Sequence, residues 1–183
     1  MDPEKLIKKY YDKNSKTYKI LIKHSEAVAK KAVEIAKRVG ADVQFVKEAA
    51  MLHDIGIFLT SAPSIGCHGK EPYIKHGILG RKILEKEGYP KHALVCERHI
   101  GVGLTKENVE KYRLPLPKKD MIPVTLEEEI VTYADKFFSK DREKEKTIKE
   151  IEEGLRRFGE EKVKKFREWK DMFEEKRTET KTL

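Results

Sequence analysis

Apolar residues recur at helical spacing along nearly all of the 183-residue chain, and segments that alternate between apolar and polar residues are hard to find. Val28, Ala32, Ile35 and Val39, for example, form one apolar stripe. A period near 3.6 residues predicts α-helices, whereas strands need a period of about two. We therefore expect an all-α helical bundle, and the chain length favours a single domain over residues 1–183.

Capping residues and helix breakers divide this pattern into elements. Predicted helices begin at Asp2-Pro3, after Asp42, near Tyr73, at Pro90 and at the Thr125-x-x-Glu128 capping box, the last running through Phe138. Residues 60–72 carry proline and glycine without a period and predict a loop, and the proline-containing residues 102–124 predict an extended connection. Two amphipathic helices over about 145–176, separated near Gly159, complete the chain.

The chain carries a mild excess of positive charge, because 40 lysine and arginine residues oppose 32 acidic ones and give a net charge of +8. This excess suits an anionic substrate. No basic stretch is interleaved with aromatic residues, so a charged, solubilising surface is favoured over a nucleic-acid-binding one. Charged residues make up 39% of the chain while asparagine and glutamine occur only three times, a pattern typical of thermophile proteins.

The cysteine content and the apolar segments of the sequence also indicate the cellular compartment of the protein. Two cysteines, Cys67 and Cys96, are too few for a disulfide framework, and Cys96 is expected to act as a small buried apolar residue. The first residues, MDPEKLIKKYYDKN, lack the apolar stretch of a signal peptide, and no run of about eighteen apolar residues is present. We therefore expect a cytoplasmic protein that does not enter a membrane. A homo-oligomer is left open.

Four histidines and two aspartates, far apart in the chain, fall on the apolar faces of the predicted helices. They are His24, His53, Asp54, His76, His99 and Asp135. A single histidine on an apolar face is more often a hydrogen-bonded core residue than a ligand. Buried polar groups without partners are costly, however, and one shared metal centre would satisfy all six at once. Their coincidence therefore predicts a metal centre.

The segment MLHDIG, with His24 before it and Asp135 in YADK after it, resembles the HD-domain superfamily. In that superfamily a histidine, a His-Asp doublet and a distant aspartate bind a divalent metal inside a helical bundle. His24, His53, Asp54 and Asp135 match these positions, and the doublet has the HDIG form. The resemblance covers about residues 20–140. It implies an HD-domain bundle to which the two C-terminal helices are an addition.

Many members of the superfamily hold two metals, and the resemblance then implies that His76 and His99 bind the second ion while Asp54 bridges both. Imidazole and carboxylate ligands together suit a transition metal such as Mn, Fe, Ni, Co or Zn, so we expect one or two such ions. Two ions can activate a water molecule and clamp phosphate oxygens. The expected reaction is hydrolysis of a phosphomonoester or phosphodiester in a nucleotide or another small phosphorylated metabolite.

One departure from the HDIG pattern concerns Ile57, where many such proteins carry a lysine that meets the substrate phosphate. Another cation must replace that lysine here. Arg98 and Lys136, each adjacent to a predicted ligand, are the candidates expected to act in catalysis with Asp54. The residues expected to bind substrate are Lys70, Arg81 and His68. For each of these side chains an ordinary surface position is an equally good interpretation.

Two other functions fit the same residues. Some HD relatives use the same set of four histidines and two aspartates in a di-iron oxygenase that cleaves carbon bonds. A non-catalytic nucleotide-binding module is the other alternative, although a complete ligand set argues against it. Phosphohydrolysis is favoured because a two-ion site serves that reaction without redox chemistry.

Overall fold

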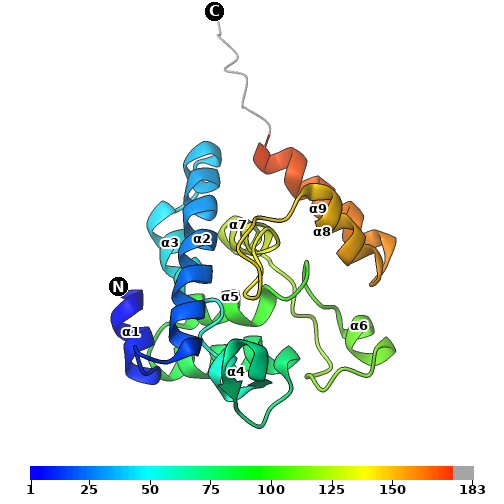
Figure 1. Cartoon of the computed structure of the whole chain (residues 1–183). Coiled ribbons are helices and arrows are strands. Elements are labelled where there is room, and N and C mark those ends of the chain that lie inside the picture. Colours follow the sequence, from blue (N-terminus) through cyan, green and yellow to red (C-terminus); the bar gives the residue numbers. More distant parts are fainter. Residues whose placement is uncertain (175–183) are drawn as a thin grey trace, which may run out of the picture.

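The computed structural model describes residues 1–174, which are mostly helical (Figure 1). The helices are α1 (Pro3–Tyr10), α2 (Lys16–Val39), α3 (Val43–Leu52), α4 (His76–Lys86), α5 (Pro90–Arg98), α6 (Lys106–Lys111), α7 (Leu126–Asp135), α8 (Ile148–Arg156) and α9 (Glu160–Glu174). Within the described residues the only sheet is an antiparallel pair of two-residue strands, β1 (Ser61–Ala62) and β2 (Cys67–His68). The predicted all-α class is confirmed.

Capping residues set the boundaries of α2 and α3. α2 begins where the Ser15 hydroxyl accepts a hydrogen bond from the Tyr18 amide, and it ends at Gly40, whose left-handed backbone (φ 78°) closes the helix. Asp42 then caps α3 by accepting a hydrogen bond from the Phe45 amide. Because only a short turn separates the two helices, α3 packs back against α2.

α7 ends at Asp135 instead of continuing to Phe138 as predicted. The amides of Lys136, Phe137 and Phe138 each bond to the carbonyl three residues earlier, so the chain tightens into a narrower turn after Asp135. The predicted capping box of α7 also forms only in half, since the Glu128 carboxylate accepts from the Val124 amide and not from the amide of the capping threonine.

Two predicted loops contain short elements. Residues 102–124 include α6, which begins at a capping box made by Thr105 and Asn108. Residues 60–72 include the β1–β2 pair and, between the strands, the 3₁₀ turn Pro63–Ile65. Further 3₁₀ turns at Ile57–Leu59 and Tyr73–Lys75 lead into and out of this region.

Apolar side chains pack into two main clusters that meet at the end of α3. The first includes Ala50 and lies mainly among α2, α3, α7 and α9, while the second includes Leu52 and lies mainly among α1, α2, α4 and α5. His53 and Asp54 follow directly and are fully buried between the two clusters. Cys96 is fully buried as predicted, and its Sγ donates to the Leu52 carbonyl.

The two predicted C-terminal helices are present as α8 and α9, separated at Gly159 (φ 125°). α7 lies between α2 and α9, so α9 adds Phe166, Trp169 and Phe173 to the first cluster (Figure 1). The predicted end of this helix near residue 176 lies outside the described residues. None of the helices within residues 1–174 has the length and apolar character needed to cross a bilayer.

The chain after α3 passes very close to α4. A Cβ atom built on Gly56 would lie 2.3 Å from the His76 carbonyl oxygen and 2.4 Å from the Gly80 amide nitrogen. Gly56 has an ordinary backbone conformation (φ −83°), so the requirement for glycine is one of space and not of torsion. The glycine of the HDIG segment therefore allows the start of α4, which carries His76, to approach Asp54.

We expect Gly56→Ala to lower the free energy of unfolding by about 1–3 kcal/mol, because the added methyl group forces the backbone of α4 away. Urea denaturation measures the change. Gly154→Ala is the matched control, since a Cβ at Gly154 meets nothing within 4 Å and alanine in a helix interior should stabilise by about 0.5–1 kcal/mol. Equal stability of the two variants would contradict the close approach of Gly56 to α4.

If the chain forms one cooperative domain over residues 1–183, as the sequence predicts, α9 should contribute to global stability. Trp169 is fully buried, so we expect Trp169→Ala to lower the free energy of unfolding by about 3–5 kcal/mol. Met172 is on the same helix but 51% exposed, and Met172→Ala should change stability by less than about 0.5 kcal/mol. Two separate unfolding transitions in the parent protein would show that α9 is not part of a single domain.

Candidate metal centre

The six predicted metal ligands converge from five helices. His24 lies on α2, His53 and Asp54 directly follow α3, and Asp135 is the last residue of α7. His76 is the first residue of α4 and His99 directly follows α5. Most of these side chains therefore belong to helix ends, where a small change of chain direction can aim a side chain at a common point.

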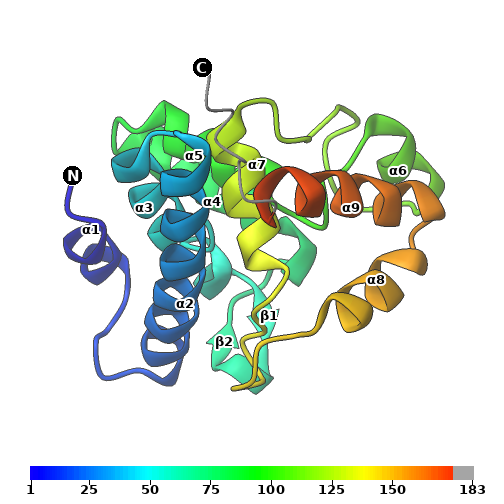
Figure 2. The same cartoon turned by 90° about the horizontal axis from the view of Figure 1, so that it is seen from above.

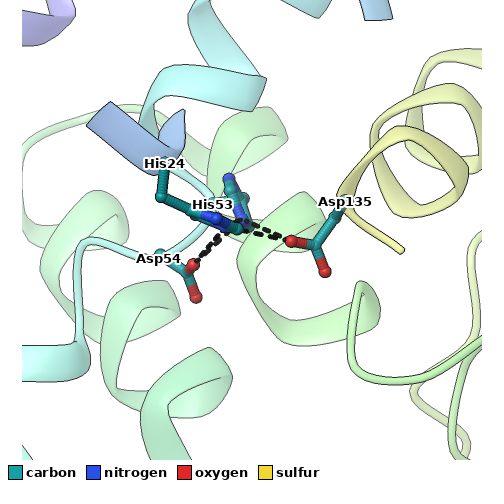
Figure 3. A group of neighbouring side chains, drawn as sticks. All are labelled: His24, His53, Asp54 and Asp135. Carbon is teal, nitrogen blue, oxygen red and sulfur yellow. Dashed lines mark hydrogen bonds and ion pairs between the residues drawn. The ribbon is translucent and has the colours of Figure 1, made fainter. Parts of the chain in front are cut away.

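The first group of ligand atoms comprises His24, His53, Asp54 and Asp135, whose side chains point toward one another (Figure 3). The His24 Nε2 lies 3.3 Å from the His53 Nε2, 3.2 Å from the Asp54 Oδ2 and 3.1 Å from the Asp135 Oδ1. The His53 Nε2 lies 3.0 Å from the Asp54 Oδ2 and 3.3 Å from the Asp135 Oδ1. Such spacings allow four atoms to share one ion at bonds of about 2 Å.

The second group comprises Asp54, His76 and His99. The Nε2 atoms of His76 and His99 lie 3.1 Å apart, and the Asp54 Oδ1 is 3.2 Å from the first and 3.5 Å from the second. Asp54 thus turns one oxygen toward each group. Within each group the ligand atoms all lie within 4.8 Å of one another.

Backbone carbonyls orient three of the imidazoles. The Nδ1 of each lies close to the carbonyl oxygen three residues earlier, at 2.6 Å for His53 and 2.7 Å for His76 and His99. Because a carbonyl only accepts hydrogen bonds, each Nδ1 carries the proton, and in the neutral ring Nε2 presents a lone pair. In neutral His76 and His99 these lone pairs face each other, an arrangement that a cation between them would stabilise.

The pKa values of the ligands reflect burial and the concentration of carboxylates. Burial lowers the pKa of His76 to about 3 and also lowers that of His99, so both rings are neutral and able to bind a metal. Burial also acts to lower the pKa of His53, but the Asp54 and Asp135 carboxylates outweigh it and raise the pKa to about 10. A site that favours a proton on a buried ring this strongly favours other cations too.

The chemistry of this donor set fits a bound metal. Asp54 is fully buried, and within the described residues its carboxylate oxygens accept no well-aligned hydrogen bond, although the Lys140 Nζ lies 2.5 Å from Oδ2. Burying a carboxylate is costly unless a cation or hydrogen bonds compensate it. Imidazole nitrogens combined with carboxylate oxygens are ligands that Mn, Fe, Ni, Co or Zn accept. The group is therefore able to hold a divalent metal ion.

A cavity of about 480 Å³ opens onto the centre. His76, His99 and Asp135 form part of its wall, together with Tyr73, whose ring lies against the His76 ring at a centroid distance of 4.7 Å. The ligands are thus accessible to a small molecule on one side while apolar clusters enclose the others.

Lys136 and Arg98 are the two cations expected to act in catalysis, and Lys136 lines this cavity. Its Nζ lies 2.9 Å from the Asp135 Oδ2 and donates a 3.4 Å hydrogen bond to the His99 carbonyl. Arg98 instead makes two 2.9 Å hydrogen bonds to the Glu128 carboxylate and does not line the cavity.

The three side chains expected to bind substrate also lie elsewhere. Arg81 donates to the carboxylates of Glu85 and Glu97 and does not line the cavity. His68 and Lys70 are exposed, and neither lines the cavity.

Lys140 was not expected at the site, yet its Nζ lies 2.5 Å from the Asp54 Oδ2. Lys146 and Tyr73 also line the cavity and were not singled out from the sequence. Lys140 begins a stretch, KDREKEK, in which basic and acidic residues alternate, and this alternation does not distinguish Lys140 from the other charged residues. Only the tight turn after Asp135 brings it back to the centre, and no signal in the sequence predicts that turn.

Comparison with known families and proteins agrees with this arrangement. The HD domain family model matches residues 21–140. An uncharacterized protein of Methanocaldococcus jannaschii is 41% identical over 143 residues, which cover 74% of this chain and 77% of that protein.

Two tRNA (cytidine(56)-2'-O)-methyltransferases are also similar. Those of Picrophilus torridus and Thermoplasma volcanium are 38% and 37% identical over 124 and 123 residues, which is 67% of this chain in each case. The matched parts make up only 33% and 32% of the two methyltransferases, so the similarity concerns about a third of each enzyme.

Among solved structures, the HD domain of the Listeria monocytogenes phosphodiesterase PgpH has the same fold, with a TM-score of 0.56 at 20% identity over 89% of this chain and 93% of that one. The same domain in complex with cyclic-di-AMP gives a TM-score of 0.55 at 19% identity, over 93% and 98% of the two chains. The family match includes all six residues of the centre. The chain belongs to the HD domain family.

Proposed function

We propose that this protein is a metal-dependent phosphohydrolase that acts on a small phosphorylated substrate through a centre of two divalent transition-metal ions. The observation that carries the proposal is the sharing of Asp54 between two groups of ligand atoms at the wall of an open cavity. Two neighbouring ions are the arrangement that supports attack of water on phosphorus.

Each ligand has a defined part in this proposal. His24, His53 and Asp135 would hold the first ion, His76 and His99 would hold the second, and Asp54 belongs to both groups of ligand atoms. Bound divalent ions lower the pKa of water and stabilise charge on phosphate oxygens. The carbonyls that accept hydrogen bonds from the Nδ1 atoms of His53, His76 and His99 leave the Nε2 atoms of these three rings free to bind a metal. Lys136, held by Asp135 and the His99 carbonyl, supplies a positive charge at the edge of the cavity.

The size and charge of the cavity support a small anionic substrate. A volume of about 480 Å³ is within the range of small-molecule sites, and the lysines in its wall favour phosphate. The HD domain of PgpH has been solved with cyclic-di-AMP, which supports a nucleotide-like substrate for this protein as well.

The methyltransferase relatives favour a second candidate, a phosphoester group on RNA. Those proteins, which share about a third of their length with this chain, are named for action on tRNA. An RNA terminus would present the same phosphate to the centre, so the two candidates differ in what lies outside the cavity. Substrate panels should therefore include short RNA with phosphate or cyclic phosphate ends.

We expect the purified, metal-loaded protein to contain about two equivalents of transition metal, and His99→Ala to lose about one of them, because the second ion then lacks one of its two imidazole ligands. His92→Ala is the matched control, since His92 is a buried histidine that contacts Glu48 outside the centre. Metal analysis by mass spectrometry measures both. Unchanged metal content in fully loaded His99→Ala protein would refute the dinuclear centre and leave the HD family assignment intact.

We expect metal-loaded protein to hydrolyse at least one of a panel of phosphomonoesters, phosphodiesters, nucleotides, cyclic dinucleotides and RNA ends. Loss of a side chain that supports a metal ligand typically lowers activity by roughly 10–100-fold. Asp54→Asn should lower the rate by more than that, because Asp54 itself would bind both ions. Phosphate release is measured in parallel under air and under nitrogen. Oxygen consumption without phosphate release would favour the di-iron oxygenase, and substrate binding without turnover would favour the binding module.

A further inference from the structure

The segment between α7 and α8 forms one wall of the cavity. It carries Lys136, Lys140 and Lys146, all of which line the cavity, together with Asp141. Figure 2 shows this segment passing beside the β1–β2 pair before it reaches α8. Three lysines from eleven consecutive positions therefore face the same space as the candidate ligands.

Lys140 is the lysine that comes closest to the centre. Its side chain is 14% exposed, and its Nζ lies 2.5 Å from the Asp54 Oδ2 and 5.9 Å from the centre of the Tyr73 ring. The contact with Asp54 and the aromatic ring both favour a positive charge at this point. Ile57, in contrast, is fully buried and offers no cation to the site.

Contacts with α2 hold this segment in place. Lys23 pairs with Glu143 at 2.7 Å and Lys31 pairs with Glu145 at 2.8 Å. The Lys31 Nζ also lies 3.8 Å from the centre of the Phe137 ring. Exposed ion pairs are individually weak, but contacts at both ends of the segment restrict where Lys140 can reach.

The anion that pairs with the Lys140 ammonium group depends on whether the negative charge of Asp54 is taken up by bound ions. Both oxygens of this carboxylate are directed at groups of metal-binding atoms, so bound ions would take up its negative charge. A buried ammonium group is costly unless it is paired, and Lys140 would then need another anion in the same cavity. Asp141 is a neighbouring carboxylate, but it is exposed and already accepts a 2.6 Å hydrogen bond from the Ser139 hydroxyl.

We propose that Lys140 binds the phosphate group of the substrate and replaces the cation that position 57 lacks in this chain. The inference rests on the proposed phosphohydrolase function. Asp54 is the partner of Lys140 in this structure. Once ions take up the charge of Asp54, the substrate phosphate would become the partner of Lys140. Lys140 is therefore a substrate-binding residue contributed by the segment after α7 and not by the HDIG motif.

The test is isothermal titration of inorganic phosphate at pH 8 into the full-length, metal-loaded protein. Lys140→Met should weaken phosphate binding by roughly 10–100-fold, the range expected for one charged hydrogen bond. Lys140→Arg keeps the charge and should restore most of the affinity. The matched control is Lys144→Met, which removes an exposed lysine from the same segment; within the described residues Lys144 makes no ion pair and does not line the cavity.

Metal content and thermal unfolding are measured for every variant, and both should stay at the values of the parent protein. Phosphate affinity in Lys140→Met equal to that of the parent would overturn the role of Lys140 and leave the proposed function standing. Loss of metal from Lys140→Met, or equal weakening by Lys144→Met, would also overturn it, since the effect would then concern the centre or the overall charge. No phosphate binding by the metal-loaded parent protein would overturn both proposals.

Discussion

A single buried carboxylate, that of Asp54, joins the two halves of the candidate metal centre. Its Oδ2 faces His24 and His53, and its Oδ1 faces His76 and His99. A charge at full burial is stable only if cations or donors surround it, so the elements that carry these histidines must all reach one point. The packing of α2, α3, α4 and α5 therefore has to bring these histidines to Asp54 as well as bury apolar side chains.

The imidazoles serve the fold and the site at the same time. The last carbonyls of a helix have no partner within it, and His53 and His99 donate to such carbonyls at the ends of α3 and α5. The same bonds direct Nε2 toward Asp54. Helix C-termini also carry partial negative charge, which favours a cation nearby. A histidine directly after a helix can therefore close that helix and present a ligand atom in one conformation.

The spacing of apolar residues predicted the helices. Four histidines fall on the apolar faces of these helices, and this placement predicted that they converge. These features succeeded because they depend on local spacing and on the cost of burying polar groups. The positions of the cations could not be predicted in the same way. Arg98 donates a hydrogen bond to Glu128, and Arg81 donates one to Glu97. Pairs between side chains far apart in the chain produce no periodic pattern in the sequence, so they cannot be predicted from spacing.

The path of the chain after α7 is the other feature that the sequence did not reveal. The apolar pattern continues through Phe138 and predicts a longer helix, but the backbone tightens after Asp135. A regular helix would carry Lys140 onward along the axis of α7. The tighter turn instead returns it to Asp54, so one local deviation of the backbone changes which cation meets the centre.

The C-terminal helices α8 and α9 lie outside the family match, and α9 helps to position the last ligand. Tyr133 and Asp135 are two residues apart on α7 and thus lie on nearly opposite sides of it. The Tyr133 ring stacks on Phe166 of α9 at a centroid distance of 5.1 Å and meets Phe173 edge-on at 5.4 Å. Since α9 fixes one side of α7, the other side holds Asp135 against His24 and His53. The C-terminal helices are therefore linked to the centre through the packing of a single helix, α7.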